Sequence, residues 1–431
     1  MTIPRDVRPD PVPLREAFWY WLKLGFISFG GPAGQIALMH AELVERRRWI
    51  SERRFLHALN YCMLLPGPEA TQLAIYIGWL MHRTRGGIIA GLLFLLPSLA
   101  LLIALSWIYM AYGNMPVVAG VMYGIKPAVV AIVLAAAWRI GTRTLKNGAL
   151  VAIALAAFVA IAVLELPFPL IVLGAAAAGV VGARVWPSHF QIGGQHPDSR
   201  ASYGIALIDD DTPTPAHARF SWPHLVGIAL FGCAFGVAAW LLIAVRFGAA
   251  NALAQMAWFF SKAALLTFGG AYAVLPYVYQ GGVEHFHWLS APQMIDGLAL
   301  GETTPGPLIM IVAFVGFVGG WTHAVLGDAS LLLAGVAGAS VAAFFTFLPS
   351  FIFILAGGPL VERSRDDVRM TAPLTAISAA VVGVIVSLAV FFGEHVFLAR
   401  GQLDLASLAI GAAACLALFR YRISTIGLIF A

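Results

Sequence analysis

Long apolar runs constrain the fold of this chain more than any other feature. The run from Gly86 to Tyr112, GGIIAGLLFLLPSLALLIALSWIYMAY, contains no charged residue. A helix needs about 20 apolar residues to cross the ~30 Å hydrocarbon core of a bilayer, so this run can span it. Similar runs recur along the chain, and the ten-residue alternation of a transmembrane β-barrel is absent from the sequence. The sequence therefore predicts an all-α polytopic membrane protein.

Composition supports this class and excludes others. Of the 431 residues, 60% are hydrophobic and 11% are charged, whereas soluble domains carry about 25% charged residues. A soluble binding module is therefore excluded. The net charge of +5 comes from basic residues that lie mostly in the loops between apolar runs, which is an orientation signal in a membrane protein. We expect the lipid bilayer as a partner and no nucleic acid.

No catalytic or metal-binding pattern is present in the sequence. The cysteines Cys62, Cys233 and Cys415 lie in separate apolar segments without pairing or metal-ligand spacing. Histidines are scattered, and there is no phosphate-binding glycine loop. We expect no enzymatic activity, no metal and no cofactor.

The chain contains an internal repeat. A shift of 239 positions aligns KLGFISFGG at residues 23–31 with KAALLTFGG at residues 262–270. The same shift aligns the Pro-Gly-Pro motifs at residues 66–68 and 305–307. Shared hydrophobicity alone does not place Lys, Gly and Pro in register. The chain is therefore predicted to consist of two homologous halves.

The register of the repeat changes once. A shift of 252 positions aligns the Leu-Pro-Ser motifs at residues 96–98 and 348–350. The difference between the two shifts indicates a longer loop in the second half, near residues 319–330.

The repeat divides the chain into five parts. Residues 1–13 are expected to be a cytoplasmic tail, and residues 14–183 and 250–431 are expected to be the two homologous repeats. Residues 184–222 are polar and rich in Gly, Pro and Asp, which predicts a cytoplasmic linker. Residues 223–246 form one unpaired apolar span, and a single extra crossing would invert the second half.

Arginines in equivalent loops support inversion. The loop HAELVERRRWISERRF at residues 40–55 has five arginines, and its counterpart QGGVEHFHWLSAP at residues 280–292 has none. Basic residues concentrate in cytoplasmic loops. The two loops are therefore predicted to lie on opposite sides of the membrane.

Glycine and proline interrupt the apolar segments at matched positions. If the Gly-Gly-Pro and Pro-Gly-Pro segments are re-entrant, every basic loop of the first half falls in the cytoplasm; full spans are the alternative. Irregular backbone is tolerated at membrane depth where it is buried in protein. Inverted repeats with broken helices are typical of transporters with a midplane site, where half-helix N-termini bind anions. The candidate glycines are Gly30, Gly31, Gly67, Gly269, Gly270 and Gly306.

Two repeat-equivalent lysines lie in these segments. Lys23 and Lys262 each precede a Gly-Gly pair by seven residues. A charge within an apolar segment costs several kcal/mol, so both are candidates to bind an anion. The alternative is that each side chain extends to the lipid interface, where nearby tryptophans also favour an interfacial position.

Acidic and hydroxyl side chains flank the breaks. Glu69 and Glu302 are candidates for proton coupling, because apolar surroundings favour the protonated carboxyl; each could instead stabilise a half-helix end. Four hydroxyls suit oxyanion oxygens, although Ser and Thr also bond back within helices. They belong to Ser28, Thr267, Thr303 and Thr304. Lys126, before Pro127, is interpreted as a helix-end charge.

At these motifs the sequence resembles the chromate ion transporter family, in its long-chain, two-domain form. The resemblance rests on FGGPAGQIALMH, RRWISERRFLHALNYCMLLPGPEATQLAIYIGW, FLLPS, YGIKPAVVAIVL, LTFGG and GETTPGPLIMIVAFVGF. Many members have Ala-His where this chain has Gly34 and Gln35, so a histidine role there does not transfer.

The resemblance implies secondary active transport of chromate, a tetrahedral dianion, across the bacterial inner membrane. Efflux that confers resistance is expected. Sulfate or another oxyanion, taken up or exchanged, and a channel-like anion pore are the alternatives. The sequence leaves a homodimer open.

Overall fold

The computed structural model describes residues 8–29, 31–113, 115–186, 190, 203–268, 271–363, 372–399, 402–421, 423 and 427–428. These residues are almost entirely helical, and one two-residue antiparallel pair, β1 (Leu398–Ala399) with β2 (Gln402–Leu403), is present among them. Six described helices are long and apolar enough to cross a membrane. The prediction of an all-α polytopic membrane protein is confirmed.

The first half begins with short helices and continues with long ones. Its helices are α1 (Leu14–Ile27), α2 (Gly31–His40), η1 (Ala41–Arg46), α3 (Glu52–Leu64), α4 (Glu69–Tyr112), α5 (Pro116–Thr144), α6 (Gly148–Ala162) and α7 (Phe168–Val185). Helix α4 is interrupted at His82 and Arg83, whose backbone angles are not helical. The linker contains η2 (Ala216–Ala218), and α9 (Trp222–Phe247) occupies the position of the predicted extra span.

The second half repeats this order. Its helices are α10 (Ala252–Leu266), η3 (Ala271–Val274), α11 (Leu275–Tyr279), η4 (Gln280–His285), α12 (Ala291–Thr303), η5 (Leu308–Met310), α13 (Ile311–Thr322), η6 (Asp328–Ser330), α14 (Leu331–Arg363), α15 (Ala372–Phe397) and α16 (Leu405–Phe419). The π-helical turns η1 and η4, and the helices α3 and α12, start and end at positions that are 239 residues apart.

Local chemistry explains why the equivalent helices begin where they do. Ser51 caps α3 by accepting a hydrogen bond from the amide of Arg54, and Ser290 caps α12 through the amide of Gln293. Serine is a favoured N-cap because its oxygen satisfies an amide that lacks a helical partner. The capping serines therefore fix the same helix start in both halves.

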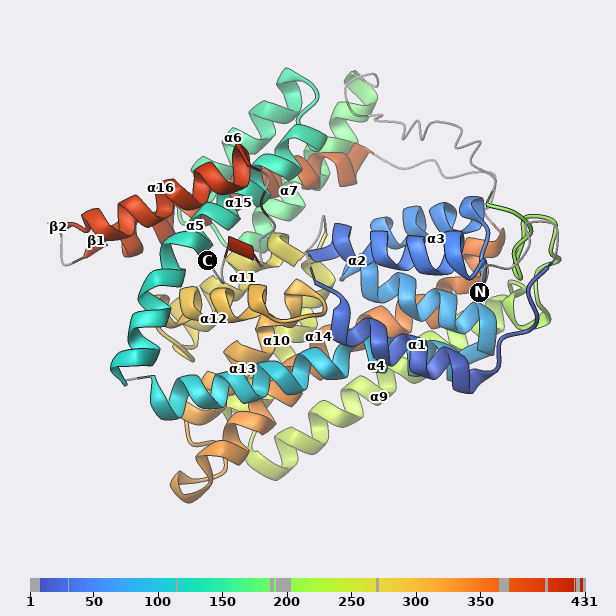
Figure 1. The fold of residues 1–431 in the computed structure, drawn as a ribbon, viewed down its shortest axis with the longest axis horizontal. Coiled ribbons are helices and arrows are strands. Elements are labelled where there is room, and N and C mark those ends of the chain that lie inside the picture. Colours follow the sequence, from blue (N-terminus) through green and yellow to red (C-terminus); the bar gives the residue numbers. More distant parts are fainter. Residues whose placement is uncertain are drawn as a thin grey trace.

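The longer helices form two bundles, each with members from both halves. The first bundle contains α1, α4, α9, α10, α13 and α14, and the second contains α5, α6, α7, α15 and α16. Helix α12 packs against members of both bundles. In Figure 1, α1, α2 and α3 lie in the right half of the molecule, whereas α11, α12 and α13 lie in the left half. The broken segments of the two halves therefore approach the centre from opposite ends.

Candidate functional site

The two halves bond reciprocally at their breaks. The amide of Gly67 donates to the carbonyl of Thr267 over 2.7 Å, and the amide of Gly306 donates to the carbonyl of Ser28 over 2.7 Å. Gly67 and Gly306 are repeat equivalents, as are Ser28 and Thr267. Each Pro-Gly-Pro motif is thus held by the interrupted helix of the other half.

Both Pro-Gly-Pro turns require glycine. Gly67 has φ +121° and Gly306 has φ +96°, which are conformations that L side chains rarely adopt. A Cβ on Gly67 would lie 2.7 Å from Oγ of Ser350, and one on Gly306 would lie 2.6 Å from Cβ of Ser98. Ser98 and Ser350 are equivalents at the shift of 252, so this contact is reciprocal too.

The four predicted hydroxyls bond back to their own helices. Ser28 and Thr267 are fully buried, and both donate to the carbonyl four residues earlier. Thr303 and Thr304 donate to the carbonyls three residues earlier. These hydroxyls and the amides of Gly67 and Gly306 therefore have protein partners in this conformation. Their predicted contact with an anion stays a prediction.

Gln35 stabilises the first break. Its side chain is buried, and its amide donates to the carbonyls of Ser28 and Gly306. A glutamine at this position thus joins the break in α1 to the Pro-Gly-Pro turn of the other half.

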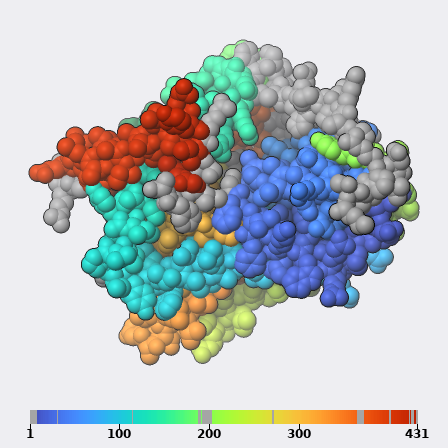
Figure 2. Space-filling model, in the orientation of Figure 1, coloured from blue at the N-terminus to red at the C-terminus, as the bar shows by residue number. Residues whose placement is uncertain are grey.

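A cavity of about 690 Å³ lies between the bundles, next to this crossing. Helices α2 and α3 form one wall, and α5, α15 and α16 form the other. Its ionisable and polar side chains are His40, Glu45, Glu69, Arg139, Arg143, Thr144, Tyr272, Glu302 and Ser378. Figure 2 shows this region as a recess between the blue first helices and the teal and red segments, with orange atoms of the second half behind it. The cavity therefore combines residues from both halves.

The predicted acids face this cavity together. Glu69 is the first residue of α4, and Glu302 lies in the last turn of α12. Oε1 of Glu302 accepts a hydrogen bond from the hydroxyl of Tyr272 over 2.5 Å. The guanidinium of Arg139 is near enough to interact electrostatically with Glu302. The structure thus places carboxyl groups and arginines in one cavity.

Arg139 and Arg143 are one turn apart near the end of α5. Neither arginine was identified as a site residue from the sequence, and Tyr272 was not identified either. Their spacing of four on an apolar helix puts both on one face, a signal that could have suggested a site.

Of the predicted glycines, Gly31 lines the cavity. It has φ +68° and is the first residue of α2, so the N-terminus of this helix lies at the cavity wall. Gly30, Gly269 and Gly270 lie outside the described residues, and their role in anion binding stays a prediction.

The two predicted lysines do not line the cavity. Both are exposed, and Nζ of Lys262 lies 5.7 Å from the ring centroid of Trp258, which is itself 60% exposed. The structure does not bring Lys23 and Lys262 together with Glu69 and Glu302. Their contact with an anion stays a prediction.

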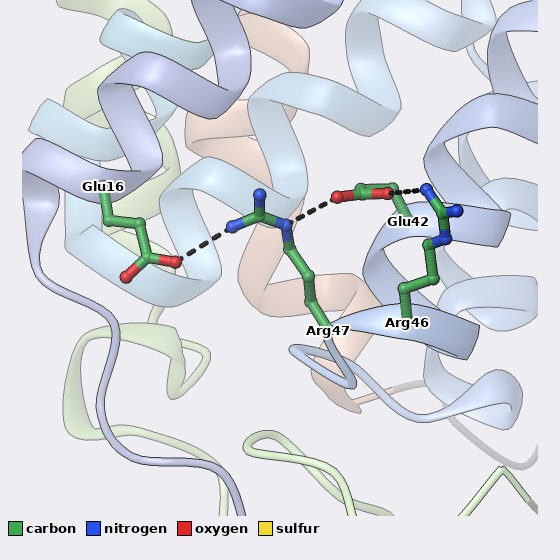
Figure 3. Close-up of polar contacts among 4 residues, drawn as sticks. All are labelled: Glu16, Glu42, Arg46 and Arg47. Atoms are coloured by element: carbon green, nitrogen blue, oxygen red, sulfur yellow. Dashed lines mark hydrogen bonds and ion pairs between the residues drawn. The ribbon is translucent and has the colours of Figure 1, made fainter. Parts of the chain in front are cut away.

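An ionic network holds the arginine-rich loop against α1. Arg47 pairs with Glu16 at 2.9 Å and with Glu42 at 2.8 Å, and Arg46 pairs with Glu42 (Figure 3). The guanidinium of Arg47 also lies 5.4 Å from the ring centroid of Tyr20. These contacts fix the loop beside the cavity mouth, which Glu45 lines.

The linker packs on the same loop. Ile50 and Ile208 form a β-bridge, and Ser51 donates to Asp210 over 2.6 Å. His82, at the interruption of α4, bonds the carbonyl of Val12 at 2.8 Å. Val12 of the tail, the arginine-rich loop and the described part of the linker therefore lie on one side of the molecule, and their cytoplasmic location stays a prediction.

Comparison with known proteins matches both halves to one family. The family model described as Chromate transporter matches residues 15–180 and 254–431. A chromate transport protein of Cupriavidus metallidurans is 30% identical over 86% of this chain and 80% of its own length. A chromate transport protein of Pseudomonas aeruginosa is 34% identical over 88% of this chain and 80% of its own length. An uncharacterized transporter of Bacillus subtilis, YwrA, is 32% identical over only 28% of this chain but 67% of its own length. No solved structure matches the chain significantly.

Proposed function

Because the chain belongs to the chromate transporter family, we propose that it exports chromate across the bacterial inner membrane as a secondary active transporter. The observation that carries this proposal is the cavity between the bundles, in which Arg139, Arg143, Glu69 and Glu302 converge. Both homologous halves supply these residues, so the cavity is the shared site of the repeat.

The cavity has the chemistry for a tetrahedral dianion. Arginine donates paired hydrogen bonds to oxyanions and keeps its charge throughout the physiological pH range. The N-terminus of α2 lies at another side of the cavity, and the positive end of a helix dipole favours an anion. Glu69 and Glu302 would repel a dianion when ionised. We therefore propose that they are protonated when the anion is bound, which would couple anion and proton movement.

The separation of two cavities favours a carrier over a pore. A second cavity lies near the opposite end of α5 and is lined by Lys126. Val129, Val130 and Val133 lie between Lys126 and Arg139 on this helix and are almost fully buried. A packed apolar segment between two cavities fits alternating access, in which movement of the bundles opens one end and closes the other.

The cavity lies next to segments that are predicted to be cytoplasmic. Its lining reaches Glu45 of the arginine-rich loop and Thr144 at the end of α5, and basic loops mark the cytoplasmic side. We propose that this structure is open to the cytoplasm, with the second half inverted and the broken segments re-entrant. Outward movement of a dianion is favoured by an inside-negative potential by about 4.6 kcal/mol per 100 mV, twice the value for one charge, and each proton that moves out with the anion reduces this by about 2.3 kcal/mol.

Sulfate is the alternative substrate, because it has the shape and charge of chromate and an arginine cavity does not distinguish them by charge. The proposal is tested by flux of chromate into proteoliposomes that contain the purified chain, with sulfate and molybdate as competitors and imposed proton and potential gradients. Saturable, gradient-dependent chromate flux is expected. If chromate neither moves nor competes, the function is wrong, and uncoupled flux without saturation would indicate a pore.

A further inference from the structure

A buried charge cluster lies at the second cavity, far from the cavity described above. Nζ of Lys126 is 3.2 Å from Oδ1 of Asp296, and the hydroxyl of Tyr109 donates to Oδ2 of Asp296 over 2.8 Å. The side chain of Asp296 is 5% exposed and that of Lys126 is 27% exposed. Lys126 lies inside α5, so its interpretation as a helix-end charge is wrong.

The cluster joins the two bundles. Tyr109 lies on α4 of the first bundle, and Lys126 lies on α5 of the second bundle. Asp296 lies on α12, in the second half of the chain. All three line a cavity of about 330 Å³, together with Gln293. Lys126 precedes Arg139 by thirteen residues, which is about 20 Å along a helix axis. The cluster and the arginines therefore lie at two levels of the same bundle interface.

The repeat shows that two helices in contact at this end correspond to two helices that face each other across the large cavity at the other end. At a shift of 239, Asp296 corresponds to His57 of α3, and at a shift of 252, Lys126 corresponds to Ser378 of α15. Helix α12 packs on α5, and the charge pair connects them. The equivalent helices, α3 and α15, instead form facing walls of the large cavity, which Ser378 lines.

The hydrogen-bond donors of this cluster suit an oxyanion as well as the carboxylate of Asp296. An ammonium and a phenol hydroxyl converge on one carboxylate at the edge of a cavity. Ionisable side chains inside a membrane bundle commonly mark a substrate pathway. If α12 moves away from α5 to open this end, Asp296 leaves both donors without their acceptor, and an oxyanion from the cavity can replace it.

We propose that Lys126 and Tyr109 form a second oxyanion site at the far end of the bundle interface, which Asp296 occupies as an internal anion when that end is closed. The site would take a tetrahedral dianion such as chromate or sulfate. This inference rests on the proposed function, because it assumes that such an anion crosses between the two cavities.

The test replaces each partner of the ion pair in turn and measures chromate flux in proteoliposomes. The protein has a single orientation in each preparation, so that each face is measured separately. Lys126→Gln should raise the half-saturating chromate concentration at the far face about tenfold or more, which is the usual effect of losing a hydrogen bond to a charged group. Asp296→Asn should lower it, because the internal competitor is weakened. Lys146→Gln and Asp328→Asn, at exposed positions, are matched controls.

Opposite effects of the two substitutions distinguish an anion-binding site from an ion pair that only holds the bundles together. If the pair only held the bundles together, neutralising either partner would change the half-saturating concentration in the same direction, and that result would overturn the proposal. Tyr109→Phe, which removes one donor without leaving an unpaired charge, should weaken far-face binding several-fold, with Tyr112→Phe unchanged. If Lys126→Gln or Asp296→Asn fails to fold, Tyr109→Phe tests the proposal by itself. Unchanged binding of chromate at the far face in Tyr109→Phe would also overturn the proposal. Absence of chromate flux in the wild type would instead refute the proposed function.

Discussion

At the residue scale, the acids were predicted from the sequence and the arginines were not. Glu69 and Glu302 adjoin the Pro-Gly-Pro motifs, so their place at the breaks could be read from local sequence. Their convergence with Arg139 depends on how α5 packs against α12 and faces α2 across the cavity, which no local pattern encodes. Lys126 was misinterpreted for the same reason, because its partner Asp296 lies in the other half of the chain.

Replacing the cavity acids should flatten the pH dependence of anion binding. Ionised Glu69 or Glu302 repels a dianion, so the wild-type half-saturating chromate concentration should rise with pH. In Glu302→Gln it should rise less, and near pH 8 it should be lower than in the wild type by at least about tenfold, because a unit charge about 4 Å from a dianion costs about 2 kcal/mol even at the dielectric constant of bulk water.

The variant and the wild type are compared at the same pH, so the protonation of chromate in solution changes the half-saturating concentration of both equally. Arg139 and Arg143 keep their charge, whereas Tyr272, His40 and Glu45 also face the cavity. His40→Gln, which removes another ionisable side chain from the cavity lining, is the control. Identical pH profiles for the wild type, Glu69→Gln and Glu302→Gln would contradict a coupling role.

The lysine pair is tested by Lys23→Gln and Lys262→Gln, measured by chromate flux. If the lysines bind the dianion from two sides, transport should be lost in both variants. If they extend to the lipid interface, as their exposure favours, flux should stay at the wild-type level. Lys146→Gln is the control for general loss of positive charge.

At the element scale, the sequence predicted the breaks and the repeat of the helices, because Gly, Pro and capping Ser act locally. The extra span and the break positions lie close to the predicted ones. The pairing of each break with the opposite Pro-Gly-Pro turn could not be predicted, since a bond between Gly67 and Thr267 depends on the arrangement of whole bundles.

The Pro-Gly-Pro turns should be intolerant of alanine. Gly67→Ala and Gly306→Ala each force a side chain into a positive-φ conformation and against a neighbouring serine. The expected loss is about 1–3 kcal/mol in the free energy of unfolding, seen as a lower thermal midpoint in detergent. Gly120→Ala in α5, where a Cβ meets open space, should be neutral or stabilising. Equal midpoints in all three variants would argue against strained, reciprocal turns.

At the scale of the whole molecule, inversion is tested at two equivalent positions. Arg46 and His285 end the equivalent turns η1 and η4, and both are exposed. In a chain without its three native cysteines, His285→Cys should react with an impermeant maleimide in spheroplasts. Arg46→Cys should react only after permeabilisation. Labelling of both from the same side would refute inversion.

The central claim is that the cavity between the bundles binds the transported oxyanion. Its most direct test is the initial rate of chromate flux against concentration in proteoliposomes that contain the wild type, Arg139→Gln, Arg143→Gln or the exposed control Arg85→Gln. The account predicts saturable flux, a half-saturating concentration raised about tenfold or more in both cavity variants, and wild-type values for Arg85→Gln. Wild-type kinetics in both cavity variants would contradict it.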